Sequence, residues 1–288
     1  MKKLNYQLKN LCDRNRDGSH GTRSERHQIL QAIANQLMTL GYRRMEASSL
    51  KPKHVEALVA HYQQEGLTSG TIKNRMSVLR WWAEKINKSN VICKDNAFYG
   101  IADRVFVTNS SKACELDKAM LARITSPSIK IALELQKAFG LRREEAIKFS
   151  PEYADQGSHI RLKSTWCKGG KAREIPIRTD EQCELLVRAQ ALAGKGSLIP
   201  DHMKYVQQLR IYESETAKAG LSKMHGLRHR YAQERYLQLT GWASPTCGGP
   251  NSQNLTTQER KQDALARLAI SQELGHERKS ITAVYLGT

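Results

Sequence analysis

The sequence predicts a mainly α protein of the α+β class, with a helical N-terminal bundle and a mixed second domain that contains a small antiparallel hairpin. Apolar residues recur at helical spacing along most of the chain, whereas β-type patterning is confined to residues 159–163 and 173–177. A chain of 288 residues with 40% hydrophobic content can build two cores. We therefore expect two domains, residues 1–110 and 111–288.

Three amphipathic helices are expected in the first 90 residues, after a polar lead-in. Thr22 and Glu25 stand at capping-box spacing before the first helix, and Gly41 ends it. The second helix begins after Pro52, and the third begins around residues 69–71. Together they predict a small helical bundle.

The second part of the sequence combines helices with the hairpin. A polar stretch at residues 107–113 marks the boundary, and helical patterning resumes at 116–140. The two β-type segments flank a turn that contains Gly169 and Gly170. Helices then return, interrupted at 241–256 by a stretch rich in Gly, Pro, Ser and Asn, which predicts an ordered loop or insertion.

Charge is the first indication of function. The formal net charge is +18, and each predicted domain contributes half of it. Such a balance favours a nucleic-acid partner, although a generally basic surface without a dedicated ligand would have the same composition. No apolar run of membrane-spanning length and no secretory leader are seen, so we expect a cytoplasmic protein without membrane contact. The six cysteines stand singly, which predicts reduced thiols and no zinc site.

Four segments of the second part carry residues suited to phosphate chemistry. They are GLRREEAIKF (140–149), KGGK (168–171), HGLRH (225–229) and LGHERKSITAVYL (274–286). Each alone has an ordinary reading as surface charge, but in this order they resemble the tyrosine recombinase, or phage integrase, family. That family has a G-L-R-x-x-E box, a hairpin lysine, an H-x-L-R-H box, and an L-G-H followed nine residues later by a tyrosine. The resemblance covers about residues 113–288.

The resemblance implies both the domain roles and the site residues. The first domain would be a core-binding, DNA-binding domain, and the second would be catalytic. The catalytic residues it implies are Arg142, Lys168, His225, Arg228, His276 and Tyr285. Glu145 and His229 would support them. Within this set His276 would donate a hydrogen bond to the scissile phosphate, and Lys163 and Lys171 remain alternatives to the hairpin lysine.

Elementary chemistry agrees with these roles. Attack of a phenol on a DNA phosphodiester needs stabilisation of two non-bridging oxygens, and the forked guanidiniums of Arg142 and Arg228 suit that task. A phenol is mostly protonated at neutral pH, so Tyr285 needs a proton acceptor, for which His225 is the family's candidate. The leaving 5′-oxygen needs a proton, which the family assigns to Lys168.

The expected reaction requires DNA and no cofactor. It conserves bond energy in a 3′-phosphotyrosine, so we expect no nucleotide cofactor, no metal and activity in EDTA. Candidate DNA contacts, whose alternative is a solvated face, are Lys73, Arg75, Arg80, Arg143 and Lys171. The resemblance implies double-stranded DNA as partner, a homo-tetramer on two sites, and a location in the bacterial cytoplasm or nucleoid, and it allows an accessory DNA-bending protein.

Three features depart from the family pattern. Arg143 stands where an aliphatic residue is usual, and the spacing between Arg228 and His276 is long, with the excess in residues 241–262. Few residues follow Tyr285. The leading hypothesis is a site-specific recombinase. The alternatives are a type IB topoisomerase-like enzyme, which the small helical first domain disfavours, and a catalytically silent DNA-binding relative, which the intact candidate residues disfavour.

Overall fold

The computed structural model describes residues 2–276 and 279–288, and it divides them into two compact units. The first unit ends at Val105 and the second begins at Phe106, a few residues before the predicted boundary. Residues 277 and 278, which fall in the predicted 274–286 motif, lie outside the described residues.

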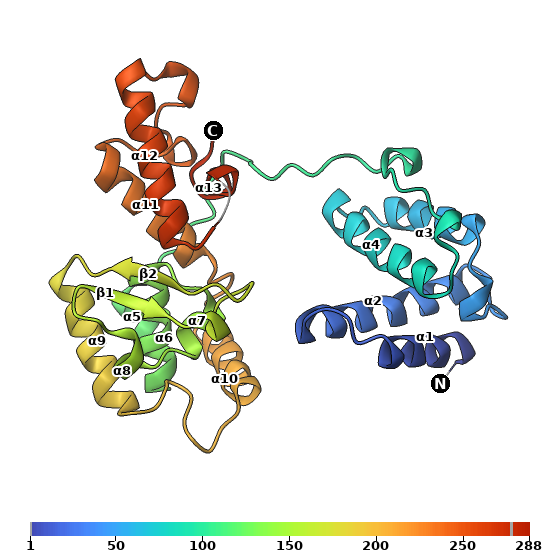
Figure 1. The fold of residues 1–288 in the computed structure, drawn as a ribbon, viewed down its shortest axis with the longest axis horizontal. Coiled ribbons are helices and arrows are strands. Elements are labelled where there is room, and N and C mark those ends of the chain that lie inside the picture. The colour runs from blue at the N-terminus through green and yellow to red at the C-terminus, as the bar shows by residue number, and fades with distance from the viewer. Residues whose placement is uncertain (1, 277–278) are drawn as a thin grey trace. The chain divides into compact units, whose positions relative to one another are not determined.

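The first unit is a helical bundle (Figure 1). Its helices are α1 (Lys3–Arg14), α2 (His20–Thr39), α3 (Pro52–Gln64) and α4 (Ser69–Lys85), with short 3-10 helices η1 (Ala47–Ser49), η2 (Ser89–Val91) and η3 (Ala97–Tyr99). The three predicted helices correspond to α2, α3 and α4 and are confirmed. Sequence reasoning missed α1, which buries Leu4 and Leu8 in the core of the bundle.

The predicted start of α2 is wrong by one turn. Ser19 caps the helix, because its side-chain oxygen accepts a hydrogen bond from the Thr22 amide at 3.2 Å. Thr22 therefore lies inside the helix and does not cap it. Both residues are good capping types, and only the local geometry decides between them.

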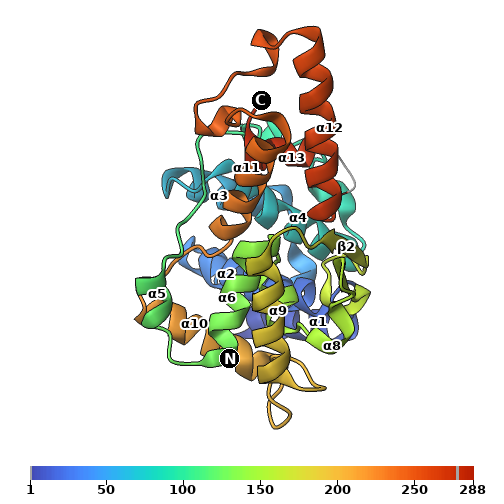
Figure 2. The ribbon, with the colours of Figure 1, turned by 90° about the vertical axis from the view of Figure 1, so that its left-hand side faces the viewer.

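The second unit is mixed, with helices surrounding one hairpin (Figures 1 and 2). Its elements are α5 (Lys118–Ala122), α6 (Pro127–Phe139), α7 (Arg143–Ile147), α8 (Pro151–Ala154), β1 (His159–Leu162), η4 (Ser164–Trp166), β2 (Arg173–Pro176), α9 (Asp180–Ala193), α10 (Tyr205–Lys218), α11 (Gly226–Thr240), η5 (Pro245–Cys247), η6 (Ser252–Asn254), α12 (Thr257–Glu273) and α13 (Lys279–Leu286). The predicted fold class, mainly α with a small sheet, is confirmed.

The hairpin pairs β1 and β2 antiparallel, with Ile160 opposite Ile175. Both isoleucines are fully buried, so one face of the hairpin packs into the domain. Gly169 and Gly170 have φ of 83° and 70° in the connection, which confirms the predicted glycine turn. The connection carries Lys168 at the edge of the sheet.

Helix α11 brings three of the four motif segments together, because it carries the HGLRH motif and packs against α6, α12 and α13. At the end of α6, Gly140 has φ of 62°, and a Cβ there would lie 2.6 Å from Cδ1 of Tyr231 on α11. Glycine is therefore required for the close approach of these segments. The residue two positions later, Arg142, consequently faces the start of α11.

The predicted insertion is ordered but shorter than 241–262, because residues from Thr257 onwards belong to α12. A Cβ on Gly249 would lie 1.7 Å from the Ala243 carbonyl oxygen, so this loop closes tightly on itself. Across residues 2–276 and 279–288, no helix has both the length and the hydropathy needed to cross a membrane.

Candidate active site

Arg142 and Glu145 form a self-contained cap at the start of α7. The Arg142 amide donates to Oε2 of Glu145 at 2.7 Å, and its Nη1 donates to Oε1 at 2.8 Å. Glu145 is fully buried, whereas the Arg142 side chain is 20% exposed. The carboxylate therefore orients the guanidinium and leaves part of it accessible.

Arg173, at the start of β2, is a site residue that sequence reasoning missed. Its Nη1 and Nη2 donate to the two oxygens of Glu145, each at 2.7 Å, and its Nε donates to the Glu273 carbonyl oxygen at 2.9 Å. Strand alternation offered a signal, since Arg173 shares the inward face of β2 with Ile175 and an inward charge needs a partner. Arg173 thus ties the hairpin to both α7 and α12.

The electrostatics of this cluster keep Glu145 ionised. Burial raises the pKa of Glu145, but the hydrogen bonds and charge of Arg173, with the charge of Arg142, outweigh burial and lower the pKa to about 2. Burial lowers the pKa of Arg173, and the bonds to Glu145 more than restore it. The three groups therefore carry one net positive charge at neutral pH.

Arg228, on the first turn of α11, is held mainly by main-chain oxygens. It is 1% exposed, its Nη1 donates to the Gly140 carbonyl at 2.6 Å, and its Nη2 donates to the Leu274 carbonyl. Its Nε donates to the Tyr285 hydroxyl at 3.2 Å. Burial lowers the pKa of Arg228 to about 10, which leaves it protonated at neutral pH.

Tyr285, on α13, points its hydroxyl into the site although it is only 5% exposed. His276 Nε2 lies 3.3 Å from that hydroxyl and 3.2 Å from Nη2 of Arg228. Burial, followed by the charges of Arg228 and Arg142, lowers the pKa of His276 to about 3. A neutral His276 accepts hydrogen bonds at Nε2, which places a proton acceptor next to the phenol.

Two further imidazoles surround the Tyr285 ring. The ring centroid of His229 lies 4.5 Å from that of Tyr285, and the centroid of His225 lies 6.1 Å from it. Burial lowers both pKa values, that of His229 to about 4. Nδ1 of His229 is buried with no hydrogen-bond partner within the described ranges. His229 therefore packs on the tyrosine as a neutral ring.

The predicted hairpin lysine lies close to these groups. Lys168 is exposed in the turn, and its positive charge contributes to the lowered pKa of His225. Of the alternatives, Lys163 is occupied, since its Nζ lies 4.1 Å from the centroid of the Tyr153 ring. Lys171 is exposed in the same connection as Lys168.

The candidate DNA contacts of α4 are engaged inside the first unit. Lys73 pairs with Asp103 at 2.6 Å, Arg75 lies over the Tyr62 ring at 4.4 Å, and Arg80 donates to the Cys93 carbonyl at 2.9 Å. In the second unit Arg143 pairs with Glu213 at 3.0 Å. These contacts bind each cation to its own unit.

A different set of cations surrounds a pocket of about 520 Å³ in the first unit. Sequence reasoning did not single them out: Arg43, Arg44, Lys51 and Lys53. All four are exposed, and none forms an ion pair in the described part of the chain. The close spacing of these cations in the sequence could have indicated the cluster, but they belong to no motif.

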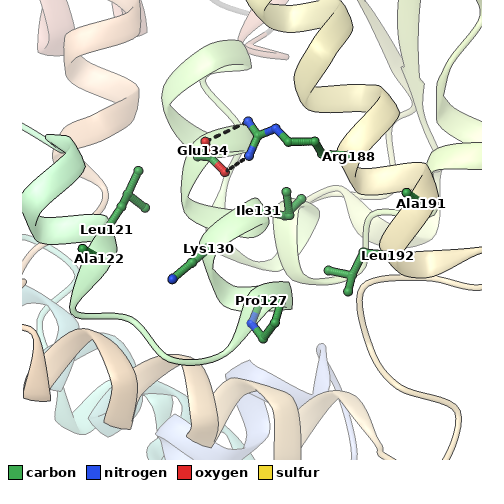
Figure 3. A pocket seen from close by; sticks show the side chains of 9 residues that line it. All are labelled: Leu121, Ala122, Pro127, Lys130, Ile131, Glu134, Arg188, Ala191 and Leu192. Atoms are coloured by element: carbon green, nitrogen blue, oxygen red, sulfur yellow. Dashed lines mark hydrogen bonds and ion pairs between the residues drawn. The ribbon is translucent and has the colours of Figure 1, made fainter.

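Another pocket, of about 550 Å³, lies between α5, α6 and α9 (Figure 3). Arg188 and Glu134 form a forked pair on its wall, with distances of 2.9 and 3.0 Å. No candidate catalytic residue lines it. Among residues 2–276 and 279–288 there is also no group of three metal-ligating side chains.

Comparison with known proteins follows the same division of the chain. Residues 1–91 match the family model "Phage integrase, N-terminal", and residues 105–234 match the family model "Integrase". A search of curated proteins by sequence gives no match.

Solved structures share the fold over nearly the whole chain. The Tn1549 transposon integrase in complex with circular intermediate DNA has a TM-score of 0.56 and 15% identity, covering 100% of this chain and 96% of its own. A lambda integrase dimer bound to a COC' core site has a TM-score of 0.62 and 15% identity, covering 96% and 76%. The XerH site-specific recombinase bound to palindromic difH has a TM-score of 0.58 and 16% identity, covering 98% and 80%.

Proposed function

Because this chain belongs to the tyrosine recombinase, or phage integrase, family, we propose that it cleaves and rejoins DNA strands at specific sites through a 3′-phosphotyrosine. The observation that carries the proposal is the Tyr285 hydroxyl bonded to the Arg228 guanidinium and to a neutral His276. The two family models support the predicted site-specific recombinase. They favour neither the topoisomerase-like nor the silent alternative.

The first step would move two protons, one from the phenol and one to the leaving 5′-oxygen, and exchange one phosphorus–oxygen bond. Arg142 and Arg228 would bind the non-bridging oxygens, while the Tyr285 oxygen attacks phosphorus and the bond to the 5′-oxygen breaks. Lys168 would give a proton to that oxygen. In the second step a 5′-hydroxyl attacks the phosphotyrosine, the proton transfers reverse, and the phenol is released.

Acceptance of the phenol proton is where geometry refines the sequence interpretation. His225 is the family's candidate base, yet His276 Nε2 is the imidazole nitrogen within 3.3 Å of the Tyr285 hydroxyl. Burial lowers the pKa values of both histidines, so both rings are neutral at pH 7. A pKa of about 3 makes His276 a weak base, so its assignment rests on its distance from the hydroxyl. We assign the first proton transfer to His276 and keep His225 for the phosphate or for a later transfer.

The two units would share the work of holding duplex DNA. We propose the predicted 1–110 region as core-binding domain and 111–288 as catalytic domain, acting as a homo-tetramer on two double-stranded sites. In the first unit we assign phosphate contacts to the cations around the 520 Å³ pocket, Arg43, Arg44, Lys51 and Lys53. Such contacts make affinity fall steeply with salt. The proposed place of action is the bacterial cytoplasm.

The test uses nicked duplexes with partly randomised sites, incubated with the protein in EDTA and resolved on denaturing gels. We expect a protein–DNA adduct with the wild-type chain and with Tyr205→Phe, a matched change on α10, and none with Tyr285→Phe. An adduct that persists in Tyr285→Phe would contradict the assignment. Salt-sensitive binding by the wild type without any adduct would instead support the silent relative.

A further inference from the structure

Gln233, on α11, joins three segments of the second unit that are far apart in sequence. It is 9% exposed, and its Nε2 donates to the Tyr285 carbonyl oxygen at 3.1 Å. Its Oε1 accepts hydrogen bonds from Oγ of Ser111 at 3.1 Å and from Sγ of Cys247 at 3.2 Å. One side chain therefore links the segment around Ser111, near the start of the second unit, with the 241–256 loop and with α13, the helix that carries Tyr285.

The Tyr285 carbonyl needs such a partner because it lies in the last turn of α13, where carbonyl oxygens find no N–H donor within the helix. Oγ1 of Thr246 also donates to it, at 3.3 Å. These two bonds fix the backbone of the residue whose hydroxyl meets Arg228. A shift of this carbonyl would move the phenol relative to the guanidinium.

A second contact joins Asn109, in the same segment as Ser111, to the residues that directly follow α13. Oδ1 of Asn109 accepts a hydrogen bond from the Thr288 amide at 3.0 Å, and in Figure 1 the C-terminus lies beside the trace that enters the second unit. A Cβ on Gly287, which has φ of 81°, would lie 2.7 Å from that Oδ1. The contact is thus too close for any residue but glycine.

The same segment packs tightly on the start of α11. A Cβ on Gly226, the glycine of the HGLRH motif, would lie 2.7 Å from the Lys112 carbonyl oxygen and 2.9 Å from the Cys114 amide nitrogen. Residues 109–114 therefore contact α11 and the two residues that directly follow α13. A change in the backbone path of residues 109–114 would therefore alter contacts with α11 and with the end of α13 together.

We propose that Gln233 is a positioning residue for Tyr285, and that residues 109–111 control the placement of the nucleophile through Gln233 and the Thr288 amide. The inference rests on the proposed function in that Tyr285 is the attacking group. Gln233 itself touches no reacting atom. Residues 109–111 lie shortly after the first unit along the chain. A change in their backbone path when DNA is bound would therefore move the Tyr285 hydroxyl relative to Arg228.

The first experiment measures hydrogen exchange of the full chain without DNA, in peptides covering residues 281–288. Gln233→Leu should speed exchange there by about fivefold to tenfold, the effect of losing one net hydrogen bond. Gln238→Leu, on the same helix, is the matched control and should leave these peptides unchanged. Unchanged exchange in Gln233→Leu would overturn the proposal.

A surface variant keeps the test independent of folding. Ser111→Ala removes the hydroxyl that bonds Gln233, whereas Ser110→Ala removes one that bonds Thr108. Ser111→Ala should also speed exchange at residues 281–288, about threefold, and Ser110→Ala should not. Equal exchange in the two serine variants would refute the role of residues 109–111.

The rate of adduct formation distinguishes a positioning role for Gln233 from a purely structural one. At saturating nicked DNA, Gln233→Leu should slow adduct formation about tenfold, with the half-saturating DNA concentration within twofold of wild type. A change in half-saturation alone would contradict positioning. If the wild type forms no adduct, the proposed function fails, while the exchange data still decide whether Gln233 anchors the Tyr285 segment.

Discussion

The two halves of the candidate site hold their arginines in opposite ways. In the half built from α7 and β2, Arg142 rests on a buried carboxylate that it shares with Arg173. In the half built from α11 and α13, Arg228 rests on two main-chain carbonyls and the Tyr285 hydroxyl. Both devices fix a guanidinium, but only the first places a full negative charge beside it.

This difference predicts that the two halves affect stability and catalysis to different degrees. The carboxylate half has a titrating partner, so it links the geometry of the site to the stability of the fold at low pH. In the described part of the chain Arg228 forms no ion pair with a carboxylate, so its charge stays directed at the phenol and at an incoming phosphate. We therefore expect changes in the first half to affect stability most and changes in the second to affect chemistry most.

The comparison is tested most severely by Arg228→Lys. An ammonium keeps the charge but carries its donors on a single nitrogen and lacks the planar fork of the guanidinium, so adduct formation should fall about 1,000-fold. Single-turnover adduct formation on nicked DNA measures this. Arg142→Lys should lose less, about 100-fold, because Glu145 keeps Arg173 as a partner. A rate for Arg228→Lys within tenfold of wild type would break the distinction.

The carboxylate half is tested by Glu145→Gln. This change leaves Arg173 buried without a counter-charge, which should cost about 3 to 5 kcal/mol of unfolding free energy. Urea unfolding followed by circular dichroism measures the loss. Arg143→Gln, two residues away on the same helix, serves as the control. A loss below about 1 kcal/mol in Glu145→Gln would show that the ion pair with Arg173 does not stabilise the fold as we infer.

The pH dependence of stability sharpens the same comparison. The pKa of Glu145 falls from about 4.3 in an unfolded chain to about 2, so its contribution is complete above pH 4.3 and is lost as pH falls towards 2. The pKa of His276 falls from about 6.5 to about 3, so the unfolded chain binds more protons between these values and stability drops as pH falls through that window.

Two variants separate these windows in urea midpoints measured from pH 7 to pH 2.5. His276→Gln should reduce the slope between pH 6.5 and 4, where His225 and His229 also contribute, and Glu145→Gln should reduce it below pH 4.3. The reverse assignment, or an unchanged slope in both variants, would contradict the electrostatics of the two halves.

The smallest effect is expected for Arg143→Gln. Arg143 forms an exposed pair with Glu213, and such pairs contribute about 0 to 1 kcal/mol. Adduct formation should stay within twofold of wild type at low salt. A strong loss of DNA binding would instead assign Arg143 to the DNA contacts that its charge suggested.

Helical periodicity predicted the fold class, which the structure confirms, whereas the boxes around Arg142, His225 and Tyr285 predicted a site whose catalytic roles stay predictions. Arg173 escaped, since its role depends on a buried partner in another element. Charge alone also does not reveal that Asp103 pairs with Lys73, so the DNA contacts expected on α4 stay a prediction. Local sequence patterns indicate which residues could take part in a site, whereas packing decides which of them already bond to partners within the protein.

The most direct test of the account is to identify the residue joined to DNA. The adduct formed on a nicked duplex in EDTA would be digested with nuclease and protease, and the nucleotide-bearing peptide sequenced by mass spectrometry. The account predicts the nucleotide on Tyr285 through a 3′-phosphate. A nucleotide on Tyr231 or Tyr236 of α11, or on a serine, would contradict it.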